Sequence, residues 1–402
     1  MRRGHKKSKT GCVQCKQRHV KVTLLHPSSC DEARPICRLC ANSNRQCSFS
    51  NPLPSANDSP SSSSHPIPET DSFATPLATS SALPPPPPPP TAAATLDDPL
   101  NLHHIELVSH MLSNKDVFNL SFDVGDHLRG VSYALTISLD APYALHQLLA
   151  LSARHLASLY PAKSADYLHL ATALQTRALS LFNAAALAKN GAIDHSNCKA
   201  VVLFSAVMAH HVLTDALTQR GDNETLDGFL SRYVQAIETT RGVMLVSMAA
   251  WPLLMAHPEA GPRIEAHALF TMREGKGDHC NGLRELVDCA DGLSEAEREA
   301  CRAAARRLQV GFDAVEEEDK EDAYRFQGVF LWTMMASPEL VALLAGKRPE
   351  ALVMLGYYAL LLYYARGMWQ VGDAGRYLMG LIMDELSTEW HSALEYPRKM
   401  MV

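Results

Sequence analysis

The sequence predicts a large all-α C-terminal domain that is joined by a disordered Pro/Ser-rich linker to a small cysteine-rich head. Six of the ten cysteines lie within residues 1–50, and residues 51–100 contain 14 of the 24 prolines but no lysine or arginine. From about Leu100 onward, apolar residues recur at spacings of three and four, and strand-like alternation is nearly absent. We therefore expect a head in residues 1–50, a linker in residues 51–100 and a helical body in residues 101–402.

The charge of the chain is as unevenly placed as its cysteines. A length of 402 residues permits two or three domains, and a hydrophobic content of 47% excludes a wholly disordered chain. The head contains 11 Lys and Arg against 2 Asp and Glu, a net charge of +9, so the overall −6 leaves −15 for residues 51–402. A polyanion such as nucleic acid is attracted to the head and repelled by the body.

The N-terminus MRRGHKKSKTG lacks the apolar segment of a secretory signal, so we expect the chain to stay in a reducing compartment. Dense cysteines there bind metal more often than they form disulfides. No segment is expected to span a membrane, because the longest apolar stretch, Ala351 to Ala365, has about 15 residues and a bilayer requires roughly 20.

The head cysteines are candidate metal ligands because of their spacing, C-x2-C-x14-C-x6-C-x2-C-x6-C. Each C-x2-C pair places two thiolates close enough to bind one cation, and tetrahedral zinc accepts sulfur ligands at about 2.3 Å. A two-zinc cluster of all six cysteines is the favoured interpretation. A one-zinc site of Cys12, Cys15, Cys37 and Cys40 is one alternative, and disulfide bonds are the other. The six cysteines are Cys12, Cys15, Cys30, Cys37, Cys40 and Cys47.

The linker and the body contain residues that mark flexible segments and the ends of helices. Ser61–Ser64 and Pro84–Pro90 predict a solvated linker with a stiff polyproline stretch. In the body, Asp140 reads as an N-cap before Pro142, Asn190-Gly191 as a helix end, and Ser294 with Glu297 as a capping box. Residues 273–292 and 311–322 are expected to be loops. The expected helices are 142–159, 165–188, 196–217, 226–240 (stopping at Gly242), 294–308, 323–335, 338–344, 349–365 and 372–390.

Two strings of the head, GCVQCKQRHVK (Gly11–Lys21) and CDEARPICRLCANSNRQC (Cys30–Cys47), resemble the DNA-binding domain of fungal binuclear zinc cluster transcription factors. The family pattern is C-x2-C-x6-C-x5-12-C-x2-C-x6-8-C. Every spacing fits except that between Cys15 and Cys30, where fourteen residues stand in place of six. Removing Val22–Ser29 would restore the complete pattern.

The resemblance implies a small zinc-stabilised head with two short helices and two Zn²⁺ ions per chain. Cys12 and Cys37 would bridge the two ions, Cys15 and Cys30 would complete the first site, and Cys40 and Cys47 the second. Pro35 matches the proline that turns the chain between the two half-modules.

The resemblance also implies that Lys16 to Lys21 form a recognition helix that enters the major groove of a CGG-like half-site. Arg18 and His19 occupy the base-reading positions, and Lys16 and Lys21 are candidates for phosphate contacts. The side chains suit these roles. An arginine guanidinium can donate two hydrogen bonds to guanine O6 and N7, and basic residues neutralise phosphates. Arg2–Lys9 is interpreted as a nuclear import signal with non-specific phosphate attraction.

The insertion Val22–Ser29 is the main departure from the family pattern. Lengthening the loop costs only about 0.7 kcal/mol, against roughly 10–16 kcal/mol for a structural zinc site, so metal binding could survive. However, the insertion separates the recognition helix from Cys30, which should anchor its end. It is either a tolerated surface loop or a sequence error such as retained non-coding sequence.

Three strings of the body, NLHHIELVSHML, FLSRYVQAIETTRGVML and WQVGDAGRYLMGLIMDEL, resemble the all-helical regulatory domain of fungal zinc cluster factors. They look most like the subgroup of sterol-uptake-control regulators, as does the final HSALEYPRKM. The resemblance implies a regulatory or activating domain that can bind a small lipid. The apolar rows Leu352–Tyr364 and Ser205–Leu217 could line such a pocket, although helix stripes are more often core.

The other candidate sites in the body give weaker evidence of a function. The histidines lack a metal-binding arrangement with a nearby carboxylate, and the four cysteines beyond the head read as small apolar residues. Glu316–Asp322 reads as a solvated acidic loop, and Gly275-x-Gly277 lacks the third glycine and preceding strand of a nucleotide-binding turn. The residues concerned are His103, His104, His110, His210, His211, Cys198, Cys280, Cys289 and Cys301.

The sequence therefore predicts a nuclear, sequence-specific transcription factor of RNA polymerase II genes that binds double-stranded DNA, works with the transcription machinery or co-regulators, and is not an enzyme. The Pro/Ser-rich linker cannot form a coiled coil, so the chain binds a single half-site or forms a homodimer through its body. The alternative is a lipid-sensing or protein-interaction regulator whose DNA-binding head is impaired by Val22–Ser29.

Overall fold

The computed structural model describes Cys12, Cys40 and Cys47 of the head and residues 101–118, 127–221, 224–256, 270–317, 320 and 322–401 of the body. The chain divides into two compact units, Met1–Thr91 and Ala92–Val402. The predicted disordered linker, residues 51–100, lies outside the described residues.

The described part of the body is helical and contains no strand, which confirms the predicted all-helical class. Short 3-10 turns at Lys115–Phe118, Pro161–Lys163 and Thr388–Leu394 join some of the helices. The helices are α3 (Leu102–Ser113), α4 (His127–Leu139), α5 (Pro142–Leu159), α6 (Ser164–Ala188), α7 (Cys198–Thr218), α8 (Leu226–Met255), α10 (Asn281–Cys289), α11 (Glu295–Val315), α12 (Asp322–Arg325), α13 (Gln327–Met334), α14 (Pro338–Ala345), α15 (Pro349–Tyr364), α16 (Ala374–Glu385) and α17 (Glu395–Met400).

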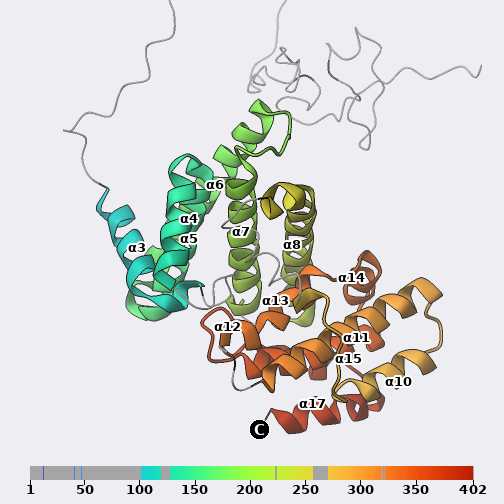
Figure 1. The fold of residues 1–402 in the computed structure, drawn as a ribbon. Helices are drawn as coiled ribbons and strands as arrows, with labels where there is room; N and C mark the ends of the chain where they lie inside the picture. Colours follow the sequence, from blue (N-terminus) through green and yellow to red (C-terminus); the bar gives the residue numbers. More distant parts are fainter. Residues whose placement is uncertain are drawn as a thin grey trace, which may run out of the picture. The chain divides into compact units, whose positions relative to one another are not determined.

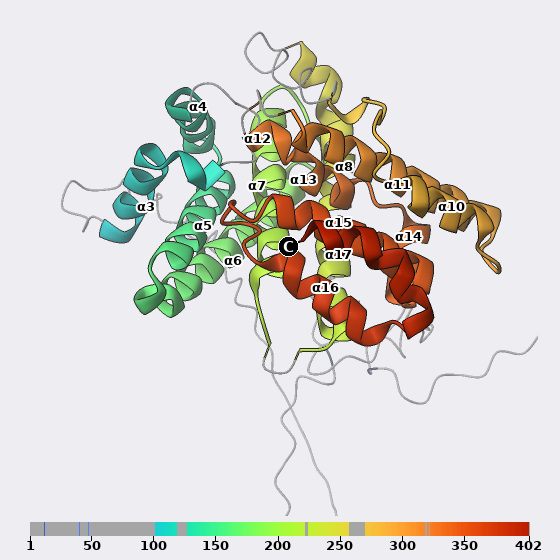
Figure 2. The same cartoon turned by 90° about the horizontal axis from the view of Figure 1, so that it is seen from below.

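The helices of the body form two groups that are joined by α7 and α8. In the first group, α5 packs against α3, α4 and α6. In the second, α11 and α15 are surrounded by the remaining helices, from α10 to α17. Helix α7 packs on both α5 and α8, and α8 continues the contact to α13, α14 and α16. Figures 1 and 2 show α7 and α8 between the two groups in both views.

Helix α15 lies at the centre of the second group. Every residue from Glu350 to Tyr363 is buried, because the sequence PEALVMLGYYALLLYY is apolar on all faces and therefore packs on all sides. Its neighbours are α10, α11, α13, α14, α16, α17 and the 3-10 turn before α17. The predicted helix 349–365 is confirmed to within one residue.

The local signals at helix ends are confirmed in two places and wrong in one. Ser294 and Glu297 form the predicted capping box, in which the Ser294 N–H donates to Glu297 Oε2 at 2.8 Å. Asn190 and Gly191 both have positive φ at the end of α6, as expected. Asp140, however, is not the N-cap of α5. The cap position is Ala141, which makes no side-chain cap bond, and Pro142 begins the helix.

Several predicted boundaries are wrong because packing extends the helices. Helix α8 continues through Gly242 to Met255, and Ala250 and Leu254 in the added turns are buried. Helix α11 continues to Val315 rather than Leu308, since Phe312 and Ala314 are core residues. The predicted loop 273–292 contains α10. The predicted helix 323–335 is broken at Phe326, and the predicted helix 372–390 ends at Glu385.

Helix α7 corresponds to the helix predicted at residues 196–217, which the sequence marks as central because it is apolar on most sides. By length and composition alone it could cross a membrane, since its 18-residue window has a mean hydropathy of 1.6. In the structure 67% of that window is buried inside the body. A central core helix has the same composition, and α7 occupies that position between α5 and α8.

A histidine pair, in which His155 is buried and His110 is half-buried, joins the first helix group to the segment before α16. The His110 Nε2 and His155 Nδ1 atoms lie 3.0 Å apart, and the His155 ring packs on Trp369 with centroids 4.8 Å apart. Burial, reinforced by the neighbouring His110, lowers the pKa of His155 to about 4. Burial also lowers the pKa of His211 on α7 to about 4. Both imidazoles are therefore neutral in the folded body at pH 7.

We predict that Gly375→Ala destabilises the body because α16 crosses α15 too closely to admit a side chain. A Cβ at Gly375 would lie 2.5 Å from both Ala359 O and Tyr363 N, which are backbone atoms that cannot rotate away. We expect a loss of about 1–3 kcal/mol in the free energy of unfolding, measured by urea titration of the helical circular dichroism signal.

The matched control is Gly380→Ala in the same helix, where an added Cβ meets nothing within 4 Å. Removing an exposed helical glycine should leave stability unchanged or raise it by up to about 1 kcal/mol. Equal effects of the two substitutions would contradict the predicted close crossing.

We predict that the body loses stability as the pH falls from about 6.5 to about 4. Unfolded histidines, with a pKa of 6.5, bind protons in this range, whereas folded His155 and His211, with a pKa of about 4, do not. Protonation thus favours the unfolded chain. The urea midpoint should fall less steeply with pH in His155→Gln than in the wild type. An unchanged slope in His155→Gln would refute the assignment.

Candidate metal centre

The described residues of the head are three cysteines that lie together. Cys12, Cys40 and Cys47 are 1%, 3% and 3% exposed, and their Sγ atoms all lie within 4.8 Å of one another. The Sγ atoms of Cys12 and Cys40 are 3.6 Å apart, although 28 positions separate the two residues in the chain. Among the residues that the structure describes, this is the one group of three or more potential metal-ligating side chains.

The sulfur separations fit a tetrahedral zinc site. Zinc–sulfur bonds of about 2.3 Å place two sulfur ligands of a tetrahedron about 3.8 Å apart. The 3.6 Å between the Cys12 and Cys40 Sγ atoms is close to that value, and it is much longer than the roughly 2.0 Å of a disulfide bond. Burial alone does not indicate a metal, because neutral thiols are commonly buried, whereas the convergence of three sulfurs does point to one.

The remaining predicted site residues of the head lie outside the described residues. They include the proposed DNA contacts, the proline turn and the insertion. Their roles therefore stay predictions. These residues are Cys15, Cys30, Cys37, Lys16, Arg18, His19, Lys21, Pro35, Arg2–Lys9 and Val22–Ser29.

The cysteines of the body differ from those of the head. Cys198, Cys280 and Cys301 are buried as predicted for small apolar residues, whereas Cys289 is exposed. Burial raises the pKa of the Cys280 thiol to about 12 and that of Cys301 to about 11. These two thiols stay protonated at neutral pH and are poor metal ligands.

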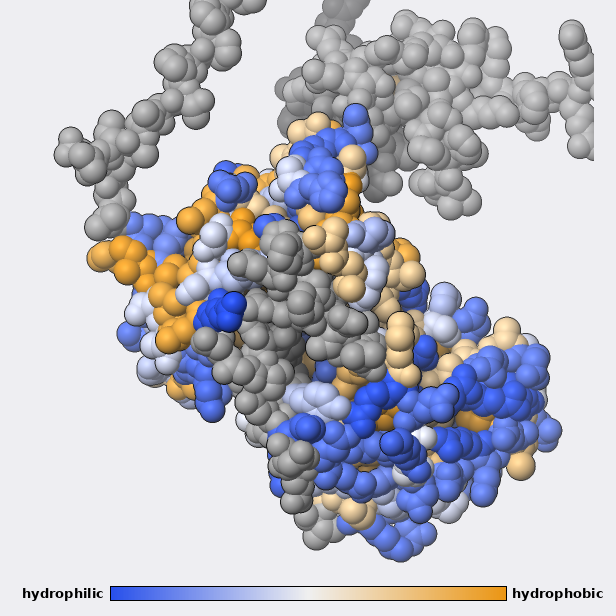
Figure 3. Space-filling model, viewed as in Figure 1, coloured by the Kyte–Doolittle hydropathy of each residue, from blue (hydrophilic) through white to orange (hydrophobic). Residues whose placement is uncertain are grey.

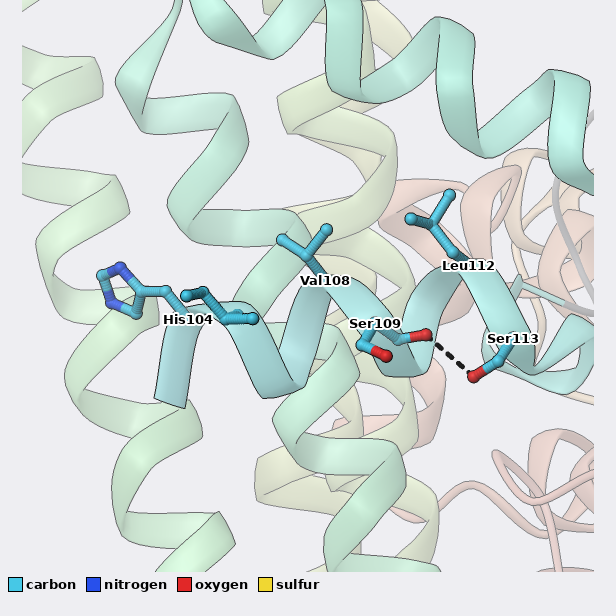
Figure 4. Close-up of a pocket in the computed structure, with 6 residues that line it drawn as sticks. His104, Val108, Ser109, Leu112 and Ser113 are labelled. Carbon is cyan, nitrogen blue, oxygen red and sulfur yellow. Dashed lines mark hydrogen bonds between the residues drawn. The ribbon is translucent and has the colours of Figure 1, made fainter. Parts of the chain in front are cut away.

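The clefts of the body lie away from the rows that were expected to line a lipid pocket. The apolar rows of α15 and α7 are mostly buried in core clusters and line neither described cleft. One cleft, of about 560 Å³, runs along α3 and is lined by His104, Ile105, Val108, Ser109, Leu112 and Ser113. In Figure 4 these side chains project from a single helix.

A second cleft, of about 600 Å³, lies beside α10 and α11 and is lined by five arginines. Sequence reasoning missed it. Residues 273–292 were predicted to be a loop, and no site was predicted in the helix that contains most of these arginines. Two signals in the sequence could have indicated this cleft. One is the density of arginine from Arg298 to Arg307, and the other is the apolar pair Leu283 and Val287, which are buried positions of α10.

Comparison with known proteins finds two curated relatives that share a description. No family model matches the sequence. A Zn(2)-C6 fungal-type transcription factor of Gibberella zeae is 25% identical over 442 aligned residues, which cover 100% of this chain and 87% of the relative. The Zn(2)-C6 fungal-type transcription factor afumD of Aspergillus fumigatus is 29% identical over 167 residues, 40% of this chain and 35% of the relative.

Neither relative's name refers to sterol uptake, so the predicted subgroup stays a prediction. The first relative aligns with the whole chain, including the segment that contains the head cysteines. Together, the two homologues and the cysteine cluster support the fungal Zn(2)-C6 transcription factor family for this chain.

Proposed function

We propose that this chain is a nuclear, sequence-specific transcription factor whose head binds double-stranded DNA at a CGG-like half-site. The observation that carries the proposal is the convergence of Cys12, Cys40 and Cys47 in a chain whose relatives are named Zn(2)-C6 transcription factors. The head is basic, with a net charge of +9, and therefore suits a polyanionic partner. The proposal assigns no catalytic step to the chain.

The grouping of the three cysteines supports the six-cysteine, two-zinc interpretation over the one-zinc alternative. In the implied cluster, the second zinc is held by Cys40, Cys47 and the two bridging residues, Cys12 and Cys37. Three of these four are the residues that lie together. The one-zinc site would leave Cys47 without a role, although its sulfur lies within 4.8 Å of the other two.

The metal would supply a structural cross-link. A module of about 50 residues buries too little surface to fold on apolar packing alone, so zinc–thiolate bonds would replace a core. Once the two half-modules are joined, Lys16 to Lys21 would be held as a short helix. In that position Arg18 and His19 would read bases, and Lys16 and Lys21 would contact phosphates.

The body is proposed to regulate or activate transcription through contacts with the transcription machinery or co-regulators. Its net charge keeps it away from the DNA backbone. On α3, Leu102 and Ile105 are 72% and 51% exposed, which supports contact of this helix with another protein or a second copy of the chain. Figure 3 shows apolar surface in this region. A bound lipid remains the alternative that the family resemblance suggests.

We predict that native mass spectrometry of the full chain finds two zinc ions per chain. Cys47→Ser should lose one ion, because the second site would retain only three thiolates. Cys198→Ser, a buried cysteine of the body, is the control and should retain both ions. One zinc in the wild type, unchanged in Cys47→Ser, would favour the one-zinc site and contradict the proposed cluster.

We predict that the full chain shifts a CGG-containing duplex in a gel assay at low salt. Arg18→Ala should weaken specific binding by about 1–3 kcal/mol, since it removes a bidentate guanine contact. The control Arg177→Ala removes an exposed arginine of α6 and should bind normally. If only a chain lacking Val22–Ser29 binds, the insertion impairs the head and the alternative function is correct. If neither chain binds, DNA recognition by this head is refuted.

A further inference from the structure

The second cleft of the body is lined by an unusual concentration of arginine. It lies beside α10 and α11, and the segment Thr271–Gly275 and Leu331 of α13 complete its walls. Two carboxylates, Glu274 and Asp288, also line it, and Ala303, Val310 and Leu331 give it an apolar part. Its volume of about 600 Å³ is in the range of small-molecule sites. The arginines are Arg273, Arg284, Arg302, Arg306 and Arg307.

Three of the five arginines are neutralised by carboxylates. Arg302 Nε lies 2.8 Å from Asp288 Oδ1, and its Nη1 lies 3.1 Å from Glu295 Oε1. Arg306 pairs with Glu299 at 2.7 Å. Arg273 pairs with Glu317 and also donates to the hydroxyl of Tyr324. These pairs hold the cleft in shape and leave little charge for a ligand.

The other two arginines have no such compensation. Within the described part of the chain, no carboxylate forms an ion pair with Arg284 or Arg307. Arg284 donates only a long 3.4 Å bond to Asn281 Oδ1. Glu274, which is exposed, is the one lining carboxylate without a described ion-pair partner. Two cations therefore face at most one unpaired acid.

Arg307 is the less solvated of the two. Its side chain is half-buried, and burial together with the neighbouring Arg306 cation lowers its pKa. It makes no hydrogen bond to another described residue. Its N–H groups are therefore left to water or a ligand, and a carboxylate or phosphate could accept two parallel N–H bonds from them.

One wall of the cleft is fixed by hydrogen bonds rather than left as a free loop. The Lys276 and Gly277 N–H groups donate to the Asp313 carboxylate at 2.6 and 3.0 Å. The Cys280 N–H donates to Gln309 Oε1 at 2.9 Å. A Cβ at Gly275 would lie 2.6 Å from Gln309 Cγ, so glycine permits this close approach. Ordering this wall would therefore add little to the free-energy cost of binding a ligand.

We propose that this cleft binds a small anionic molecule that carries a carboxylate or phosphate group beside a short apolar part. Arg284 and Arg307 contact the anionic group, and Ala303, Val310 and Leu331 contact the apolar part. Figure 3 shows hydrophilic residues gathered over the region that α10 and α11 occupy in Figure 1, in contrast to the apolar surface over α3. The site goes beyond DNA binding, because the net-acidic body and not the head contains it.

The test measures binding to the full chain by isothermal titration at low ionic strength, with octanoate and inorganic phosphate as probes. Octanoate should bind more tightly than phosphate, because it also fills the apolar part. Arg307→Gln and Arg284→Gln should each weaken octanoate binding about tenfold or more, the effect of losing a charge-assisted hydrogen bond. Arg177→Gln on α6, an exposed arginine outside the cleft, should leave binding unchanged.

Three outcomes would overturn the proposal. The first is unchanged octanoate binding in both cleft variants. The second is equal binding of octylamine, which would show attraction to the apolar part alone. The third is binding only to vesicles that contain anionic lipid, which would show a surface charge effect. Circular dichroism verifies that each variant is folded, and if one of the two is not, the other decides the result.

Discussion

The fold of the body depends on the burial of α15 on every side. A helix without a polar face must be surrounded by other helices, and α15 is contacted by α10, α11, α13, α14, α16 and α17. At the crossing of α16 the absence of a side chain at Gly375 lets α16 approach the α15 backbone directly. The same packing fixes α11, which provides most of the arginines of the second cleft. The shape of that cleft is thus a consequence of the core.

Local sequence signals predicted the body well where the local chemistry is decisive. The capping box of Ser294 and Glu297 and the left-handed end at Asn190 and Gly191 require only neighbouring residues. The boundaries that were wrong depend on distant ones. Gly242 read as a helix end, but the buried Ala250 and Leu254 stabilise the turns beyond it. No pattern within one window records such contacts.

The two candidate sites also differ in how far the sequence predicts them, because one depends on a local spacing pattern and the other on contacts between distant residues. Zinc is bound by a few residue types at restricted spacings, so Cys12, Cys40 and Cys47 could be recognised as candidate ligands from the sequence alone. The second cleft combines Arg284 of α10 with Arg307 of α11, and α10 itself was not predicted. Its significance depends on which arginines have carboxylate partners, and that information exists only in three dimensions.

The burial of the body thiols makes the body cysteines less reactive toward oxidants than the head cysteines would be. Electrophiles and oxidants react with thiolates, and the raised pKa values of Cys280 and Cys301 keep these sulfurs protonated and unreactive. In the proposed zinc cluster the head cysteines would be deprotonated, and they would become reactive if the ion left. Cys289 is the one exposed cysteine of the body, so an oxidant that reaches the folded body meets this thiol before the three buried ones.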